Sequence, residues 1–138
     1  MMYMAIIVDT SGIIATRNKD DADHEAAVDL MRALLQRKHG DAFITDYIFD
    51  EAVTIALVRT KNPEFAMDVG NFILNTKRIT KIHTTQGDFQ EAWSLFQDFI
   101  EKKLSFTDCT IIAIARRLGV ENIFTFDSHF DGILNRIG

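Results

Sequence analysis

The sequence predicts an α/β fold in which a parallel β-sheet is covered by helices on both faces. Short apolar runs alternate with longer segments of helical periodicity along the whole chain. Strands separated by helices pair in parallel, because each parallel connection needs a long crossover. The apolar content is 47% and proline occurs once, which is typical of a compact chain without linkers. We therefore expect one domain, residues 1–138, around a single central sheet.

Four short segments are expected as strands, and three of them run directly into an aspartate. The segment from Ile79 to His83 alternates in polarity, so it is the candidate for an edge strand. The expected strands are residues 4–8, 42–45, 79–83 and 123–126.

The helices are indicated by apolar stripes and by residues that favour helix ends. Thr85 with Asp88 and Ser105 with Asp108 have the spacing of capping boxes, and Gly119 supplies a stop. Residues 10 and 11 enter a turn or short helix, and residues 18–23 form an exposed loop. The longer helices are expected at 27–35, 46–58, 62–73, 85–100, 108–118 and 128–137.

Composition excludes several kinds of protein. The net charge of −5 argues against a broad basic surface for nucleic acid. The single cysteine, Cys109, excludes an intramolecular disulfide and a thiolate-rich metal site. The apolar run from Met1 to Val8 lacks a basic leader and ends at Asp9, so we expect neither a signal peptide nor a membrane span. A cytoplasmic protein is the expectation.

Four acidic residues carry the functional prediction. Asp9 and Asp127 each follow a strand, at the edge where parallel sheets bind ligands. Glu51 and Asp108 lie in early turns of helices that are expected to begin at the same edge. Four carboxylates in one cleft repel each other unless a cation neutralises them. Oxygen ligands select a hard ion, so the pattern points to Mg²⁺ or Mn²⁺.

Each of these acids also has an ordinary structural explanation. Asp9 and Asp127 could be N-caps of the helices that follow them. Asp108 could complete a capping box with Ser105, and Glu51 could be a solvated helical residue. These roles are the commoner ones for any single acid, and only the four together indicate a site.

Four motifs also resemble those of the PIN-domain family, in the family's order and over nearly the whole chain. They are Val-Asp-Thr-Ser at 8–11, Thr-Asp-Tyr-Ile-Phe-Asp-Glu at 45–51, Phe-Thr-Asp-Cys-Thr-Ile-Ile-Ala at 106–113 and Thr-Phe-Asp-Ser-His-Phe at 125–130. The resemblance implies a metal-dependent ribonuclease with a central parallel sheet. Such a protein is often the VapC-type toxin of a toxin–antitoxin pair.

The resemblance also assigns roles to individual residues. Four residues match the family's metal-binding and catalytic acids: Asp9, Glu51, Asp108 and Asp127. They are called the acidic quartet here. Hydroxyl side chains match supporting positions at Thr10 or Ser11 and at Thr107. One or two Mg²⁺ or Mn²⁺ ions would activate water to hydrolyse single-stranded RNA. A homodimer and a small antitoxin covering the cleft are also implied, and a housekeeping role in RNA processing stays open.

Three neighbouring residues are ambiguous. Asp50 should point about 100° away from Glu51 around the helix, which makes it the weaker ligand. Asp131, expected on a terminal helix, could be a peripheral ligand through water or a solvated surface acid. His129 lies two residues from Asp127, but no paired-histidine spacing supports a zinc site.

RNA would have to be held by basic residues around the acids. Each candidate also has a bland explanation as solvated surface or as a charge at a helix C-terminus. The candidates nearest the motifs are Arg17, Lys19, Arg59, Lys61, Arg116 and Arg117.

Two other functions fit parts of the pattern. A magnesium-dependent phosphohydrolase would use Asp9 as a covalent nucleophile, but residue 11 is serine where the usual Asp-x-Asp pattern has its second aspartate. A catalytically inactive interaction module would use the acids only as caps. Binding of Mn²⁺ would distinguish the nuclease from the module.

Overall fold

The computed structural model describes residues 3–138, which form a parallel sheet of five strands in the order β3-β2-β1-β4-β5. The predicted α/β class is therefore confirmed. The strands are β1 (Ala5–Val8), β2 (Asp41–Thr45), β3 (Ile79–Ile82), β4 (Asn122–Phe124) and β5 (Asn135–Ile137).

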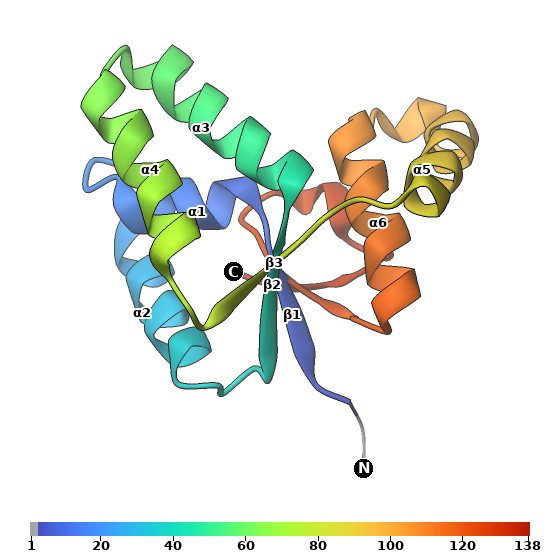
Figure 1. Ribbon diagram of the computed structural model, residues 1–138, viewed down its shortest axis with the longest axis horizontal. Coiled ribbons are helices and arrows are strands. Elements are labelled where there is room, and N and C mark those ends of the chain that lie inside the picture. Colours follow the sequence, from blue (N-terminus) through green and yellow to red (C-terminus); the bar gives the residue numbers. More distant parts are fainter. Residues whose placement is uncertain (1–2) are drawn as a thin grey trace.

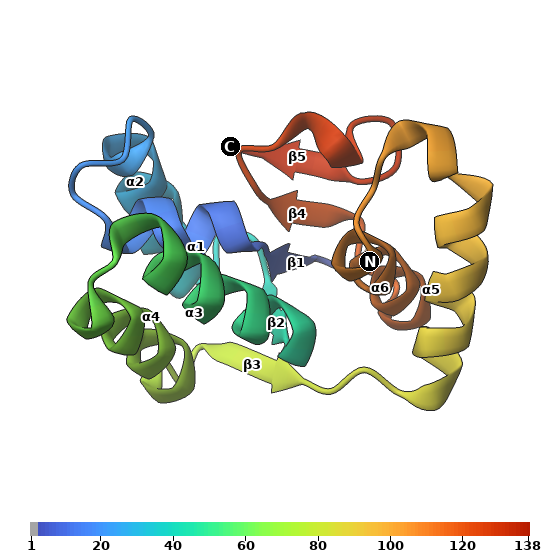
Figure 2. The ribbon, with the colours of Figure 1, turned by 90° about the horizontal axis from the view of Figure 1, so that it is seen from above.

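Helices cover both faces of this sheet. Helices α1 to α4 lie on one side of it and α5 and α6 on the other (Figure 1 and Figure 2). Within residues 3–138, no helix combines the length and the apolar character needed to cross a membrane. The helices are α1 (Thr10–Arg17), α2 (His24–Leu35), α3 (Asp46–Thr60), α4 (Pro63–Asn75), α5 (Gln86–Asp98) and α6 (Phe106–Leu118), with short 3₁₀ turns η1 (Ile100–Lys102) and η2 (Ser128–Phe130).

The central strands are apolar because helices exclude water from both of their faces. All four residues of β1 are buried, as are Ile123 and Phe124 of β4. Buried parallel strands read as continuous apolar runs for this reason. Strand β3 lies at the sheet edge, as its alternating sequence predicts.

The two predicted capping boxes and the predicted stop at Gly119 are confirmed. Thr85 with Asp88 and Ser105 with Asp108 both form complete capping boxes. The Asn62 side chain accepts backbone hydrogen bonds at the start of α4, and Gly119 ends α6 in the left-handed conformation at φ 72°. These caps begin and end the helices at defined residues, which places α6 with its first turn at the carboxyl edge of the sheet.

The predicted terminal helix, Ser128 to Ile137, is wrong. Only Ser128–Phe130 is helical, as a single 3₁₀ turn, and Asn135–Ile137 pairs in parallel with β4. Gly132 adopts φ 84° between the two, a conformation that interrupts a right-handed helix. The chain therefore turns back and adds a fifth strand to the sheet edge.

The strand order creates a topological switch point beside β1. The chain runs outward from β1 to β2 and β3, then returns to add β4 and β5 on the other side. Val8 at the end of β1 pairs with Phe124 at the end of β4. Asp9 and Asp127 therefore follow neighbouring strands at the carboxyl edge, where open parallel sheets bind ligands.

Helix α1 packs so closely over the sheet that only glycine fits at residue 12. A Cβ atom there would lie 2.9 Å from the Phe124 carbonyl oxygen and 3.0 Å from its ring. We expect Gly12→Ala to lower the free energy of unfolding by about 1–3 kcal/mol, because helix and strand must separate. Urea denaturation measures this change.

Gly87 provides the matched control, because it is also helical but exposed. A Cβ atom at residue 87 meets only the Thr85 hydroxyl oxygen, at 3.8 Å. Gly87→Ala should be neutral or slightly stabilising. Equal stability of the two variants would contradict the close packing of α1 on β4.

Candidate metal centre

Asp9 lies directly after β1 with only 3% of its surface exposed. Its Oδ2 accepts a hydrogen bond of 2.9 Å from the Thr125 hydroxyl. Its Oδ1 is buried and has no hydrogen-bond partner in the described part of the chain. Asp9 occupies the N-cap position of α1, but its side chain makes no capping hydrogen bond to that helix.

The environment of Asp9 disfavours its charge. Burial is the largest cause that raises its pKa, to about 7, and the nearby charges of Asp108 and Glu51 raise it further. Hydrogen bonds from the Thr10 backbone and the Thr125 hydroxyl oppose the rise only in part. A buried carboxylate oxygen without a donor, beside other carboxylates, is suited to a cation.

Glu51 lies in the second turn of α3, half-buried rather than solvated. Its Oε1 accepts a short hydrogen bond of 2.6 Å from the Thr10 hydroxyl at the start of α1. Burial raises its pKa, and the charges of Asp108 and Asp127 add to the rise. Thr10 therefore aims Glu51 toward the carboxyl edge of β1.

Asp108 has the capping role considered for it and also lies near other acids of the quartet. Its Oδ2 accepts from the Ser105 backbone N–H at 3.0 Å, which closes the predicted capping box. The same oxygen lies 3.5 Å from Nδ1 of His129. The carboxylate is nevertheless close enough to raise the pKa of both Asp9 and Glu51. The cap fixes its orientation without removing its charge from the group.

Asp127 follows β4 by three residues and is partly buried. It occupies the N-cap position of η2, but its side chain makes no capping hydrogen bond there either. Its charge contributes to the raised pKa of Glu51. The fold therefore brings together all four acids of the quartet, from β1, α3, α6 and the end of β4.

Thr125 joins these segments and was missed by the sequence analysis. Its hydroxyl donates to Asp9 and accepts from the Asp127 backbone N–H at 3.1 Å. Because its one proton goes to Asp9, the Ser11 hydroxyl donates to Thr125 across 3.0 Å. Ser11 in turn accepts from the Phe126 N–H at 2.9 Å. These bonds tie the start of α1 to the end of β4.

A cavity of about 240 Å³ opens beside these acids. Asp9 and Asp108 do not line it. The residues around it, which define the acidic cavity, are Thr10, Ser11, Ile14, Asp21, Asp23, Glu51, Ile55, Arg59, Phe126 and Asp127.

The donor set of the quartet fits a hard divalent cation. It offers carboxylate oxygens, including the unpartnered Oδ1 of Asp9, and charges that repel one another. Across residues 3–138, however, no three acidic, histidine or cysteine side chains already stand where they could hold a metal ion. To bind an ion, side chains of the quartet would have to move closer together. Glu51 and Asp127 can do so by changing rotamer, because both are partly exposed.

Comparison with known proteins identifies the family. The model of the PIN domain family matches residues 6–133. The chain belongs to the PIN-domain family. It is 29% identical, over 126 residues and 91% of each chain, to the 23S rRNA-specific endonuclease VapC20 of Mycobacterium tuberculosis. This PIN domain is therefore a homologue of VapC-type ribonucleases.

Solved structures give the same result for the fold. The crystal structure of VapC20, described as a sarcin-ricin loop cleaving toxin, matches with a TM-score of 0.82 and 27% identity over 92% of this chain and 93% of that one. VapBC2 of Rickettsia felis, solved with a DNA fragment from its promoter, has a TM-score of 0.70 at 16% identity over 97% and 98%. That second likeness concerns the fold alone.

The ambiguous acids lie outside the acidic cavity of this PIN domain. Asp50 is exposed and does not line the cavity, as its angle from Glu51 predicts. Asp131 is exposed and forms a two-bond ion pair with Arg136, of 3.0 and 3.2 Å. Thr107 is half-buried beside Asp108, and its backbone carbonyl accepts from the Thr110 hydroxyl.

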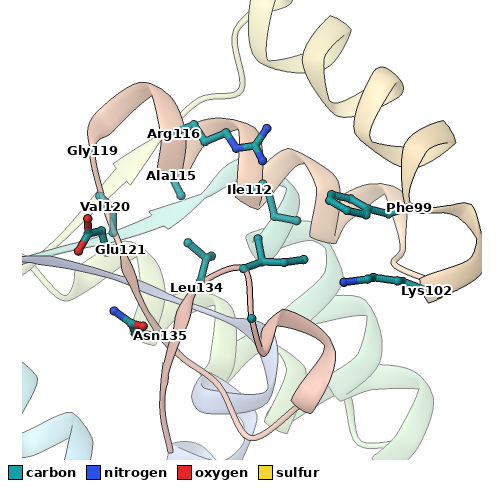
Figure 3. A pocket seen from close by; sticks show the side chains of 12 residues that line it. Phe99, Lys102, Ile112, Ala115, Arg116, Gly119, Val120, Glu121, Leu134 and Asn135 are labelled. Carbon is teal, nitrogen blue, oxygen red and sulfur yellow. The ribbon is translucent and has the colours of Figure 1, made fainter.

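A larger cavity, of about 690 Å³, lies elsewhere in this PIN domain (Figure 3). It is lined mainly by the second half of α6 and by residues at or just before the starts of β4 and β5, including Arg116, Glu121 and Asn135. Those strand starts are at the opposite edge of the sheet from the quartet. No quartet residue lines this cavity, so the smaller one is the better candidate for chemistry.

Proposed function

We propose that this PIN domain is an endoribonuclease that needs Mg²⁺ or Mn²⁺ and cleaves single-stranded RNA. The observation that carries the proposal is the buried, unpartnered Oδ1 of Asp9, surrounded by carboxylates that repel it. Such a group is costly in the free protein and is stabilised by a divalent cation. Asp9, Glu51, Asp108 and Asp127 are the proposed metal-binding and catalytic residues.

The hydroxyl side chains would act by positioning these acids. Thr10 holds Glu51, and Thr125, supported by Ser11, holds Asp9. Thr107 is a further supporting position beside Asp108. A bound Mg²⁺ or Mn²⁺ would polarise the phosphodiester, lower the pKa of water and offset the charge of the leaving 3′ oxygen.

Water is the nucleophile that fits this site. Cys109 is buried, and burial raises the pKa of its thiol to about 11, so it does not supply a thiolate. Asp9 is also buried and hydrogen-bonded to Thr125, which disfavours the alternative phosphohydrolase with Asp9 as covalent nucleophile. Hydrolysis by water would leave a 5′-phosphate and a 3′-hydroxyl.

The relatives support a proposal for the biological setting. VapC20 is named as an endonuclease specific for 23S rRNA, and the Rickettsia felis neighbour is a VapBC complex. We therefore assign this chain as the toxin of a VapBC-type pair, working as a homodimer on cytoplasmic RNA and blocked by an antitoxin. The alternatives are an RNA-processing nuclease without a toxin role and an inactive interaction module.

The test is cleavage of end-labelled single-stranded RNA of mixed sequence, with Mn²⁺, Mg²⁺ or EDTA. We expect cleavage with either metal, none with EDTA, and products that carry 5′-phosphates. Cleavage should persist when single 2′-hydroxyls are replaced by hydrogen, because water attacks rather than the ribose. Cleavage in EDTA, or products with 2′,3′-cyclic phosphates, would contradict the proposal.

A further inference from the structure

Arg59 is the basic side chain among the residues that line the acidic cavity. It lies in the last turn of α3 and is exposed. Its charge reaches Glu51, because it opposes the rise in the pKa of that carboxyl group. It forms no salt bridge with any residue in the described range 3–138, so its guanidinium is available to a ligand.

Three of the other basic residues expected around the acids are already paired. Arg17 forms a two-bond ion pair with Asp68 of α4, at 2.9 and 2.8 Å. Arg117 binds Asp88 with three hydrogen bonds of 2.9 to 3.1 Å. Arg116 lies 3.4 Å from a carboxylate oxygen of Glu91. Ion pairs within the protein therefore compete with RNA for these three arginines.

The position of Arg59 along α3 suggests which part of a substrate it meets. Glu51, Ile55 and Arg59 are spaced by four residues, and all three line the acidic cavity. Eight residues of helix place the backbone of Arg59 about 12 Å beyond that of Glu51 along the axis. Ile55 provides an apolar wall between the acid and the cation.

We propose that Arg59 binds a phosphate of the RNA strand adjacent to the one that is cleaved, and so directs the strand along α3 across the cavity. This inference rests on the proposed ribonuclease function. The guanidinium presents planar, paired donors that match phosphate oxygens. It also supplies positive charge where a polyanion must approach several carboxylates, which would otherwise repel it. Arg59 is a positioning residue and takes no part in bond cleavage.

The competing explanation is that Arg59 only complements the dipole at the C-terminus of α3. That role would contribute about 0.3–1 kcal/mol to stability and nothing to RNA binding. Lys61 is the matched control, because it is an exposed cation two residues further on, at the C-cap of α3, and does not line the cavity.

The experiment compares Arg59→Gln, Arg59→Lys and Lys61→Gln. Steady-state cleavage of a labelled single-stranded RNA with Mn²⁺ gives kcat and KM. Binding of the same RNA is followed by fluorescence anisotropy over a range of NaCl. These proteins also carry Asp108→Asn, so that cleavage is slow during the measurement. Both the cleavage assay and the binding assay include the corresponding protein that retains Arg59.

For Arg59→Gln we expect KM to rise about 10-fold with kcat changed less than 3-fold, the size of one lost charged contact. The slope of log affinity against log salt should fall by about 0.7, as for one phosphate contact to a single strand. Arg59→Lys should restore the slope and only part of the affinity. Lys61→Gln should leave KM and slope unchanged.

A second readout locates the contact on the RNA. A single uncharged methylphosphonate linkage is moved along the strand on either side of the cleaved bond. At one position beside the cleaved bond, the methylphosphonate should weaken RNA binding by the protein that retains Arg59. The same linkage should cause no further loss of binding by Arg59→Gln.

The outcomes separate the two proposals. Metal-dependent cleavage with equal KM, slope and methylphosphonate pattern in Arg59→Gln and Lys61→Gln would overturn the role of Arg59 and leave the ribonuclease intact. RNA binding with the expected slope change but without cleavage would support Arg59 and contradict the nuclease. Absence of RNA binding by the parent protein would overturn both.

Discussion

Asp108→Asn is expected to lower the rate of RNA cleavage on the order of 10²–10³-fold while leaving the fold intact. The substitution removes a charged metal ligand, and metal-ion catalysis is worth several kcal/mol in the transition state. The fold should survive because an asparagine oxygen can still accept the Ser105 N–H bond of the capping box. Single-turnover cleavage with saturating Mn²⁺ measures the loss, and circular dichroism checks the fold.

Two adjacent acids on α3, Asp50 and Glu51, provide a second test with an internal control. Glu51→Gln should cause a loss of similar size, because Glu51 lines the acidic cavity. Asp50→Asn should retain activity within about 3-fold, because Asp50 is exposed and points elsewhere on the helix. Retention of full activity by Glu51→Gln or Asp108→Asn would show that the quartet is not the catalytic centre.

The second large effect concerns stability without metal. Asp9→Asn should raise the free energy of unfolding of the metal-free protein by about 2–4 kcal/mol at pH 8. The reason is that the pKa of Asp9 is raised from 3.8 to about 7, so the buried charge destabilises the fold once it forms. The asparagine oxygen can still accept from Thr125, and its amide can donate toward neighbouring carboxylates.

The pH dependence follows from the direction of this shift. Between pH 4 and 7 the unfolded chain has released the Asp9 proton and the folded chain has kept it. The free energy of unfolding of the metal-free wild type therefore falls as pH rises through this range. Above about pH 7 the contribution of Asp9 no longer changes with pH. The difference between Asp9→Asn and wild type should be small at pH 4 and largest at pH 8. Urea denaturation in EDTA at several pH values measures it, and a difference independent of pH would contradict the buried charge.

Mn²⁺ should reduce the difference in unfolding free energy between wild type and Asp9→Asn. At 100 times its dissociation constant, a ligand that binds only the folded state adds about 2.7 kcal/mol. Wild type should gain this stabilisation, and Asp9→Asn should gain little. Equal stabilisation of both proteins would place metal binding elsewhere.

Much of the fold could be predicted because helix and strand periods alternate clearly. The missed element, β5, has only three residues and lies at the sheet edge. Phe130, Ile133, Leu134 and Ile137 have helical spacing, and no local signal shows that the last of them pairs with Phe124. Pairing between strands is decided by tertiary contacts, which the local pattern of so short a segment does not contain.

The meeting of the quartet could also be predicted, because parallel strands end at one edge and helices begin there. The role of Thr125 could not, since threonine is an ordinary strand residue. Its hydroxyl reaches Asp9, 116 positions away in sequence, only through the register of β1 with β4. The pairing of Arg17 with Asp68, 51 positions apart, also depends on tertiary packing and could not be predicted. Sequence spacing shows which acids share an edge of the sheet. Hydrogen bonds between distant segments decide which basic side chains remain without an acidic partner.

The most direct test of the proposed metal centre is a crystal of this PIN domain soaked in Mn²⁺ and measured for anomalous scattering. We expect an anomalous peak among the carboxylates of Asp9, Glu51, Asp108 and Asp127, with Oδ1 of Asp9 as a ligand. The peak should be lost in crystals of Asp9→Asn. A peak only at other acids, such as Asp21 and Asp23, or none in an ordered site, would contradict it.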